Sequence, residues 1–290
     1  MLHKVAVIGA GRVGTALALN LKEKGYPVVA VASRSPSTAQ KLAEAVGAKA
    51  CPVNADAARV AELVFITTPD GSIAPAGEEI AGAEGFRPGQ FVAHTSGALP
   101  AAVLQPAKDA GAAIFSLHPL QSFATPALAV ERLPGSYFTF EGDPEALPLA
   151  GRLVAELGGR LFRIDAASKP LYHAAACVAS NYLVSLMHFM YDLAEQAGLQ
   201  RESIFEAFSP LIQGTLSNVG VVGPTAALTG PIARGDADTI RRHALAMGSR
   251  QWELYRILGL YTVKLARERG LAAEASAALE RIFCEVKQHG

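Results

Sequence analysis

Four polar side chains of different chemistry lie close together in the sequence: an amine, an imidazole, a hydroxyl and an amide. At about 100° per residue in a helix, Lys169 and His173 fall on one face, and Ser180 returns to that face with Asn181 beside it. A helix packed against a core normally carries an apolar stripe instead. The pattern predicts a substrate site, although His173 and Asn181 could instead be hydrogen-bonded polar residues of the core.

Hydride transfer to a C=O or C=N bond is the chemistry that suits these groups. The hydride goes to carbon, so the heteroatom needs a proton or a positive donor, which Lys169 or His173 could supply. Asn181 could orient the substrate, and Ser180 lies on the face that would meet it. We therefore predict Lys169, His173 and Asn181 as catalytic residues and Ser180 as a substrate contact.

Two further candidates follow predicted strands at residues 90–94 and 112–117. The hydroxyl of Ser96, with nearby backbone N–H groups of the Ser96-Gly97 turn, could bind a substrate carboxylate. His118 could be a second acid, or it could anchor the loop that begins at Pro119. Because the carboxyl ends of parallel strands meet at one edge of a sheet, these turns are expected to form the rim of one site.

A glycine motif supplies the expected cofactor site. The sequence KVAVIGAGRVG (4–14) is an apolar run followed by G-x-G-x-x-G and a helical pattern, the context in which this motif indicates dinucleotide binding. The first glycine allows a tight turn, the second lets the backbone approach a pyrophosphate, and the third lets the helix pack closely. An ordinary glycine-rich turn is the alternative. The predicted contacts are Gly9, Ala10, Gly11, Arg12, Val13 and Gly14.

The residues after the second predicted strand, 27–33, favour NADP over NAD. Ser33-Arg34-Ser35 has no carboxylate for a ribose 2′-hydroxyl, whereas an arginine between two hydroxyls suits a 2′-phosphate. The alternative is a solvated loop arginine. A third predicted strand, 63–67, ends in Thr67, Thr68 and Pro69, which we expect at the same cofactor edge.

The remaining pattern divides the chain into an α/β part and a helical part. Strands are predicted at 136–141 and 160–164, with helices at 37–46 (capped by Ser37) and 144–157. After residue 165 only helices are predicted, at about 169–198, 204–216, 239–258 and 272–287. The predicted fold is a Rossmann domain with a doubly wound, mostly parallel sheet (1–165), followed by an all-α substrate and dimerisation domain (166–290).

Composition excludes several classes of function. Lys plus Arg equals Asp plus Glu at 26 each, so neither nucleic acid nor an anionic membrane is an expected partner. The three cysteines are widely spaced, which predicts no disulfide framework, no metal site and a reducing cytoplasm. The N-terminus has no signal-peptide pattern, and polar residues within 174–191 favour a core helix over a membrane span.

Four motifs carry a resemblance to a known family. HTSGA (94–98), SLHPLQSF (116–123), KPLYHAAACVASNYL (169–183) and LTGPIARGD (228–236) resemble the bacterial Rossmann-like oxidoreductases with a C-terminal domain of unknown function. More broadly, the chain resembles the 6-phosphogluconate dehydrogenase and 3-hydroxyisobutyrate dehydrogenase superfamily. Its Rossmann half is also similar to pyrroline-5-carboxylate reductase and to deazaflavin-dependent NADP oxidoreductases.

The resemblance implies roles for only some residues. The superfamily's catalytic lysine matches Lys169 and its Ser-Gly substrate turn matches Ser96-Gly97, whereas its asparagine one turn after the lysine is replaced here by His173. The division of work between Lys169 and His173 therefore stays open.

The superfamily commonly buries its helical domains in a homodimer. Arg234 could then reach a substrate carboxylate in its own copy or across the dimer, or could simply belong to a turn and the start of a helix.

The sequence therefore favours a cytoplasmic NADP-dependent oxidoreductase acting on a small molecule. The expected substrate is a 2-oxo acid resembling ketopantoate or a cyclic imine. The main alternative is a regulatory or redox-sensing protein that binds NADP without turnover. A deazaflavin:NADP oxidoreductase is a third hypothesis, which predicts a second flat cofactor.

Overall fold

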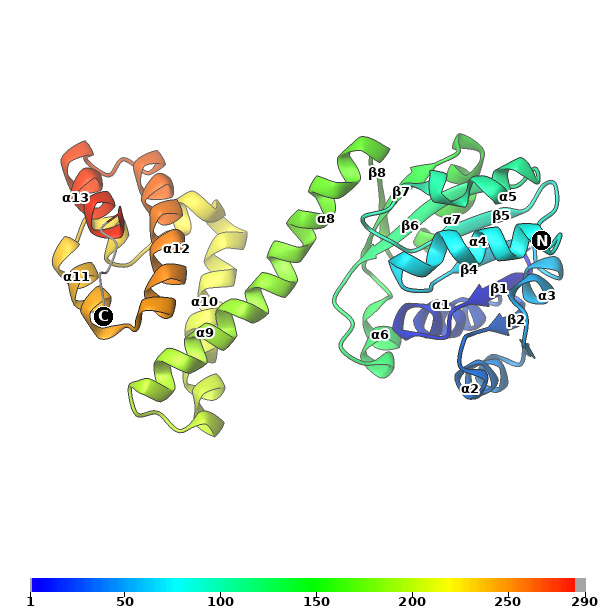
Figure 1. Ribbon diagram of the computed structural model, residues 1–290, viewed down its shortest axis with the longest axis horizontal. Coiled ribbons are helices and arrows are strands. Elements are labelled where there is room, and N and C mark those ends of the chain that lie inside the picture. Colours follow the sequence, from blue (N-terminus) through cyan, green and yellow to red (C-terminus); the bar gives the residue numbers. More distant parts are fainter. Residues whose placement is uncertain (1, 285–290) are drawn as a thin grey trace. The chain divides into compact units, whose positions relative to one another are not determined.

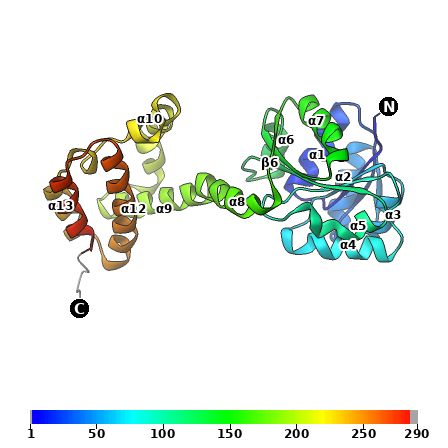
Figure 2. The same ribbon diagram turned by 90° about the horizontal axis from the view of Figure 1, so that it is seen from above.

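A computed structural model describes residues 2–284, which form two compact units that divide between Leu183 and Val184 (Figures 1 and 2). The change from sheet to helices falls earlier, because the last strand ends at Arg163. The first unit therefore contains the whole sheet and also the beginning of the long helix.

One eight-stranded sheet forms the centre of the first unit, in the order β3-β2-β1-β4-β5-β6-β7-β8. All strands from β1 to β6 are parallel, whereas β7 runs antiparallel to β6 and β8 runs parallel to β7. This confirms the predicted mostly parallel sheet. The strands are β1 (Val5–Ile8), β2 (Val28–Ala32), β3 (Lys49–Cys51), β4 (Leu63–Ile66), β5 (Phe91–His94), β6 (Ala113–Leu120), β7 (Tyr137–Gly142) and β8 (Arg160–Arg163).

Helices cover both faces of the sheet, as Figure 2 shows. Successive side chains of β1 point to opposite faces, so Val5 and Val7 pack with α1, α2, α6 and α7, while Ala6 and Ile8 pack with α3, α4 and α5. The sheet is therefore doubly wound. These helices are α1 (Arg12–Glu23), α2 (Pro36–Val46), α3 (Asn54–Arg59), α4 (Ile73–Gly82), α5 (Gln105–Asp109), α6 (Pro126–Arg132) and α7 (Leu147–Glu156).

The glycine turn joins β1 to α1 in the way that the motif predicts. Gly9 has φ +107°, a conformation that L side chains rarely adopt, and a Cβ there would lie 2.9 Å from the Thr67 carbonyl carbon. A Cβ on Gly14 would collide with the Gly9 carbonyl oxygen. By contrast, a Cβ on Gly11 would meet nothing within 4 Å. Two of the glycines are needed for packing, and the middle one faces open space.

Local differences from the sequence prediction have physical causes. Helix α2 begins at Pro36 and is capped by Ser35, not by Ser37, because Ser35 Oγ accepts the Thr38 N–H at 3.4 Å. Strand β6 continues to Leu120, so His118 and Pro119 lie in a strand where the sequence predicted a turn. Pairing with antiparallel β7 extends it, since residues 115–120 all have partners there.

The long helix begins at Lys169 as predicted, but its geometry changes part-way. It consists of α8 (Lys169–Cys177), a π-helical segment (Val178–Tyr182) and α9 (Leu183–Gln196). A π-helix has more residues per turn than an α-helix, so rotation by 100° per residue holds only as far as Cys177. Ser180 and Asn181 therefore lie where the α-helical face prediction no longer applies strictly.

The second unit is helical, and Trp252, Val263, Leu279 and Phe283 form the centre of its core. The predicted helix 239–258 is divided at Met247 and Gly248 into two helices. Gly223 interrupts α10 with φ +77°, and position 287, where the last helix was predicted to end, lies outside the described residues. The helices are α10 (Arg201–Ala227), α11 (Ala237–Ala246), α12 (Ser249–Glu268) and α13 (Ala273–Cys284).

Within residues 2–284, no helix combines the length and apolar character needed to cross a lipid bilayer.

The close packing at Gly14 predicts a stability difference between two glycine variants. Gly14→Ala must move α1 away from β1, so it should lower the free energy of unfolding by about 1–3 kcal/mol, as overpacking typically does. Gly11→Ala, the control in the same motif, should lower it by less than about 1 kcal/mol, because its Cβ enters open space. Urea denaturation measures both. Equal stability of the two variants would contradict the packing role of Gly14.

Candidate functional site

A pocket of about 640 Å³ lies at the carboxyl ends of β1, β2 and β4. This is where the order of the sheet reverses direction, between β1 and β4, and where doubly wound sheets bind ligands. The predicted Arg12, Val13 and Gly14 form the adjoining first turn of α1. The other nine predicted cofactor residues line the pocket: Gly9, Ala10, Gly11, Ser33, Arg34, Ser35, Thr67, Thr68 and Pro69.

The pocket fits the pyrophosphate of a dinucleotide. The first-turn amides of α1 have no acceptor within the helix, and that turn holds no acidic residue to compete with an anion. Gly11 leaves the approach open. Thr68 Oγ1 is buried and has no hydrogen-bond partner among the described residues, so a bound molecule could satisfy it.

The ribose end of the pocket contains both a cation and a carboxylate. Arg34 is exposed at the lining, and Ser35 Oγ lies 3.1 Å from Ser37 Oγ, so part of the hydrogen-bonding capacity of Ser35 serves α2. Farther along the lining, Asn54 Nδ2 donates to Glu79 Oε2 at 2.9 Å. One oxygen of the Glu79 carboxylate is therefore engaged by the Asn54 amide. The sequence analysis did not single out Glu79.

A line of contacts runs from this pocket to Lys169. Asp70 follows Pro69 of the lining, and its Oδ2 accepts the Ser96 hydroxyl at 2.8 Å. The Ser96 carbonyl in turn accepts the Lys169 Nζ at 3.3 Å. The structure thus brings Ser96, from a turn at the sheet edge, together with Lys169, from the start of α8, and adds Asp70 between them and the pocket.

Lys169 is completely buried, at 0% exposure. Its Nζ donates to Ser116 Oγ at 2.7 Å, and Ser116 Oγ donates to the Ser96 carbonyl at 3.0 Å. Burial lowers the pKa of Lys169, while the negative charges of Glu141 and Asp70 act in the opposite direction. A buried serine on a strand and a buried lysine on a helix therefore hold the Ser96 carbonyl between them.

The Ser96 hydroxyl is already engaged within its own turn. Besides donating to Asp70, its Oγ accepts the N–H groups of Ala98 at 3.2 Å and Leu99 at 3.1 Å. The sequence analysis predicted that N–H groups near Ser96 could bind a substrate carboxylate, and these two N–H groups of that turn are already bound by Ser96 Oγ. Binding a carboxylate there would require them to leave Ser96.

His94 anchors the same turn from beneath. Its Nδ1 accepts the Ser96 N–H at 3.1 Å, which assigns the ring proton to Nε2 for donation to the Pro100 carbonyl at 3.2 Å. His94 is fully buried, and burial, with the nearby Lys169 charge, lowers its pKa to about 4. It is a structural residue, and the sequence analysis did not single it out.

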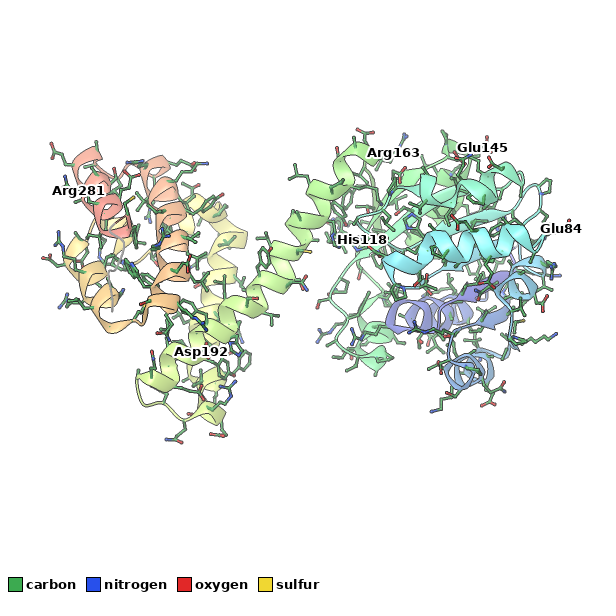
Figure 3. The ribbon with its side chains drawn as sticks, viewed as in Figure 1. Glu84, His118, Glu145, Arg163, Asp192 and Arg281 are labelled. Atoms are coloured by element: carbon green, nitrogen blue, oxygen red, sulfur yellow. The ribbon has the colours of Figure 1, made fainter. Side chains whose placement is uncertain are left out.

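Two histidines converge on Gly97. A Cβ there would lie 2.9 Å from His118 Cε1 and Nε2 and 2.9 Å from His173 Cδ2, so only glycine leaves room for both rings. The ring centroids of His118 and His173 are 6.3 Å apart. Figure 3 labels His118 at the margin of the sheet, on the side from which α8 extends. Gly97, His118 and His173 thus lie close together.

His118 also contacts a residue that the sequence analysis did not single out. Its Nδ1 lies 2.9 Å from the Tyr172 hydroxyl. Burial, together with Lys169 and His173, lowers the pKa of His118 to about 4. Two residues of this network could have been noticed in the sequence. Tyr172 stands beside His173, and Ser116 is a single hydroxyl in an apolar strand. Both patterns are also common in protein cores, so neither indicates a site by itself.

The remaining predicted residues lie elsewhere. Ser180 and Asn181 are in the π-helical segment, where Asn181 is exposed. The other ring edge of His173 faces its own helix, because His173 Nδ1 lies 3.8 Å from the Cys177 sulfur. Arg234 belongs to the second unit, where it lines a separate hollow with Thr229. Residues 2–284 contain no cluster of three or more His, Cys, Asp or Glu side chains suited to a metal.

Comparisons with known families agree with the fold and the pocket. Residues 2–119 match the family described as Rossmann-like domain, and residues 136–262 match the domain of unknown function DUF2520. The chain combines a Rossmann-like domain with a DUF2520 domain. This confirms the resemblance inferred from the four sequence motifs.

Solved structures share this two-part architecture. A Thermotoga maritima protein is 27% identical, with a TM-score of 0.67, and the match covers 91% of this chain and 97% of that protein. A Bacteroides fragilis protein described as a candidate NADP oxidoreductase is 23% identical, with a TM-score of 0.68 and coverages of 97% and 98%. A reductive aminase from Aspergillus terreus, solved with NADPH and ethyl levulinate, is 20% identical, with a TM-score of 0.63 and coverages of 98% and 93%. The last two similarities establish the fold.

The lowered pKa of His94 predicts acid sensitivity of the fold. Between pH 6.5 and about 4 the unfolded chain binds a proton at this residue that the folded chain does not, so stability falls as the pH falls through that window. His94→Asn keeps an acceptor for the Ser96 N–H but does not titrate. Its loss of unfolding free energy between pH 7 and pH 4.5 should be smaller than that of the parent by about 2 kcal/mol.

Urea denaturation at the two pH values gives this difference. His3→Asn, a change to a histidine outside the network, serves as the matched control and should keep the parent's pH dependence. An unchanged pH dependence in His94→Asn would contradict a lowered pKa at this residue.

Proposed function

We propose that the protein is an NADP-dependent oxidoreductase that transfers a hydride between NADPH and a carbonyl or imine group of a small molecule. The observation that supports this best is the continuous line from the dinucleotide pocket through Asp70 and Ser96 to the buried Lys169. It connects the expected cofactor to the side chains able to assist a reduction. The descriptions of two structural neighbours, an NADP oxidoreductase and a reductive aminase, agree with this proposal.

NADP is proposed over NAD because of Arg34. The guanidinium stands at the pocket lining beside Ser33 and Ser35, in the position where the ribose of a dinucleotide is expected. A guanidinium can bind a phosphate through two parallel hydrogen bonds. Arg34 would therefore hold the 2′-phosphate, while the first turn of α1 holds the pyrophosphate.

The chain's own residues would share the work of the reaction in the following way. Bound NADPH would supply the hydride. Lys169 is enclosed and hydrogen-bonded to Ser116 and to the Ser96 carbonyl, so it would fix the Ser96-Gly97 turn. Its positive charge would stabilise the negative charge that develops on the substrate. His173, whose ring edge faces Gly97, would deliver the proton to the substrate heteroatom, and Asn181 would orient the substrate.

For the substrate we propose a small 2-oxo acid or a cyclic imine. The 2-oxo acid needs a carboxylate partner, and because the Ser96 turn uses its own donors, we propose Arg234 for that contact. An imine can arrive already protonated and needs less acid catalysis. The pH profile separates the two: turnover of an imine should fall as pH rises through the pKa of the iminium, independently of His173.

A homodimer is proposed because α10 carries an apolar surface. Of its 27 residues only Ile204 is buried, while Leu211 and Val221 are 66% and 80% exposed. Exposed apolar surface of this extent is typical of an interface. We propose that a second copy of the chain covers this surface.

A reducing cytoplasm is the proposed location, since Cys51, Cys177 and Cys284 form no disulfide bonds.

Arg34→Asp should reverse the coenzyme preference. Replacing the cation by an anion removes the phosphate contact and adds repulsion, so NADPH affinity should fall by about 100-fold or more while NADH affinity changes little. Fluorescence titration with both coenzymes measures this. Arg59→Asp, which alters an arginine outside the pocket, is the control. An equal loss for NADPH and NADH would contradict the assignment of NADP.

Lys169→Ala should lower turnover by about 100-fold or more if the amine acts electrostatically in the reaction. Lys169→Met, which refills most of the buried volume without a charge, should be similarly impaired, and this separates chemistry from packing. The assay follows NADPH absorbance with a panel of 2-oxo acids and imines. If the parent protein binds NADPH but turns over no substrate, and Lys169→Ala behaves like it, the NADP-sensing alternative is favoured.

A further inference from the structure

Tyr172 is held by contacts from two strands of the first unit. It lies in the first turns of α8, and its hydroxyl is 2.9 Å from His118 Nδ1 on β6. Its ring meets the His118 ring edge-on, with centroids 5.7 Å apart, and meets Phe162 of β8 edge-on at 6.2 Å. The position of the hydroxyl is therefore fixed by packing as well as by its hydrogen bond.

The two nitrogens of His118 face different surroundings. Nδ1 faces Tyr172, whereas the Cε1–Nε2 edge faces the Ser96-Gly97 turn, as the contacts of a Cβ built on Gly97 show. Within the part of the chain that the structure describes, Nε2 has no hydrogen-bond partner. The edge of His118 that faces Gly97 thus keeps its hydrogen-bonding capacity free, and the other edge is engaged.

We infer that Tyr172 is a positioning residue: its hydroxyl donates to His118 Nδ1 and keeps the ring proton on Nε2, from which His118 donates a hydrogen bond to the substrate's oxygen or nitrogen. This inference rests on the proposed reduction of a carbonyl or imine. As hydride adds to carbon, the electron pair of the double bond moves to the heteroatom, and the Nε2–H stabilises the charge that develops there. His118 keeps its proton. A carbonyl product takes its proton from His173, whereas an imine that binds already protonated needs no further proton.

The direction of the Tyr172 hydrogen bond follows from the two groups. A phenol is a better donor than a neutral imidazole N–H, and the unprotonated imidazole nitrogen is a better acceptor than a phenol oxygen. Thr139 pairs with His118 across β6 and β7. The Thr139 hydroxyl makes no hydrogen bond of normal geometry to a described residue. It lies near the Tyr172 oxygen and lowers the pKa of Tyr172, but burial raises that pKa by more.

His118 is neutral at physiological pH, since its pKa is about 4. A neutral imidazole exists as two tautomers, and only the one with Nε2–H can donate toward Gly97. A neutral histidine that polarises a carbonyl is a known catalytic arrangement. The Tyr172 hydroxyl therefore decides whether His118 presents a donor or a lone pair to the substrate.

The tautomer can be measured without any turnover. In the full-length protein with ¹⁵N-labelled histidine, long-range ¹H–¹⁵N spectra should show His118 protonated at Nε2, with the signals assigned from His118→Gln. Tyr172→Phe keeps the ring contacts and removes only the hydroxyl, so it should give a mixture of tautomers. A parent protein protonated at Nδ1, or a Phe variant with an unchanged spectrum, would overturn the inference.

A double-mutant cycle tests the catalytic part. Tyr172→Phe should lower kcat about tenfold with NADPH affinity unchanged. His118→Gln places an amide donor close to the Nε2 position and has no tautomers, so adding Tyr172→Phe to it should cause no further loss. Equal losses in both backgrounds would show that Tyr172 does not act through His118.

Tyr137→Phe, at a half-exposed tyrosine of β7 bonded to Arg160, should leave both the spectrum and kcat unchanged. If the parent protein reduces no carbonyl or imine of the panel, the proposed function fails, and with it the catalytic role of His118. The spectra would then still decide whether Tyr172 sets the tautomer, so the two failures can be told apart.

Discussion

The candidate site depends on the burial of one amine. Lys169 enters a fully enclosed position at the start of α8, where Ser116 of β6 and the Ser96 carbonyl after β5 accept its hydrogen bonds. Burying an amine is costly unless its donors are satisfied, so these acceptors and this helix must be placed together. Because α8 is fixed in this way, His173 is brought beside Gly97 and Tyr172 beside His118.

The same burial shapes the electrostatics of the site. His94 and His118 lie near Lys169, and desolvation combined with the lysine's positive charge lowers both imidazole pKa values to about 4. Asp70 and Glu141 counteract part of the cost for the lysine itself. Two imidazoles beside Lys169 are therefore held neutral at physiological pH, so each can act as a hydrogen-bond donor and acceptor rather than as a cation.

Much of this arrangement could be predicted from residue spacing. The glycine motif placed the pocket, and the rule that parallel strands end at one edge placed the Ser96-Gly97 turn and His118 on the same side of the sheet. The extension of β6 through His118 could not be predicted, because it depends on antiparallel β7, which is distant in sequence. The engagement of the Ser96 hydroxyl by Asp70 and the π-helical segment are likewise tertiary effects, invisible to a helical wheel.

The two outer strands of the sheet limit how copies of this protein can associate. Strand β3 has three residues, and β8 has four with arginine at both ends. Short strands and charged termini discourage the addition of a foreign strand to an open sheet edge. Self-assembly by continuing the sheet from one copy into another is thereby disfavoured, which leaves contacts between helices as the route to a closed, finite assembly.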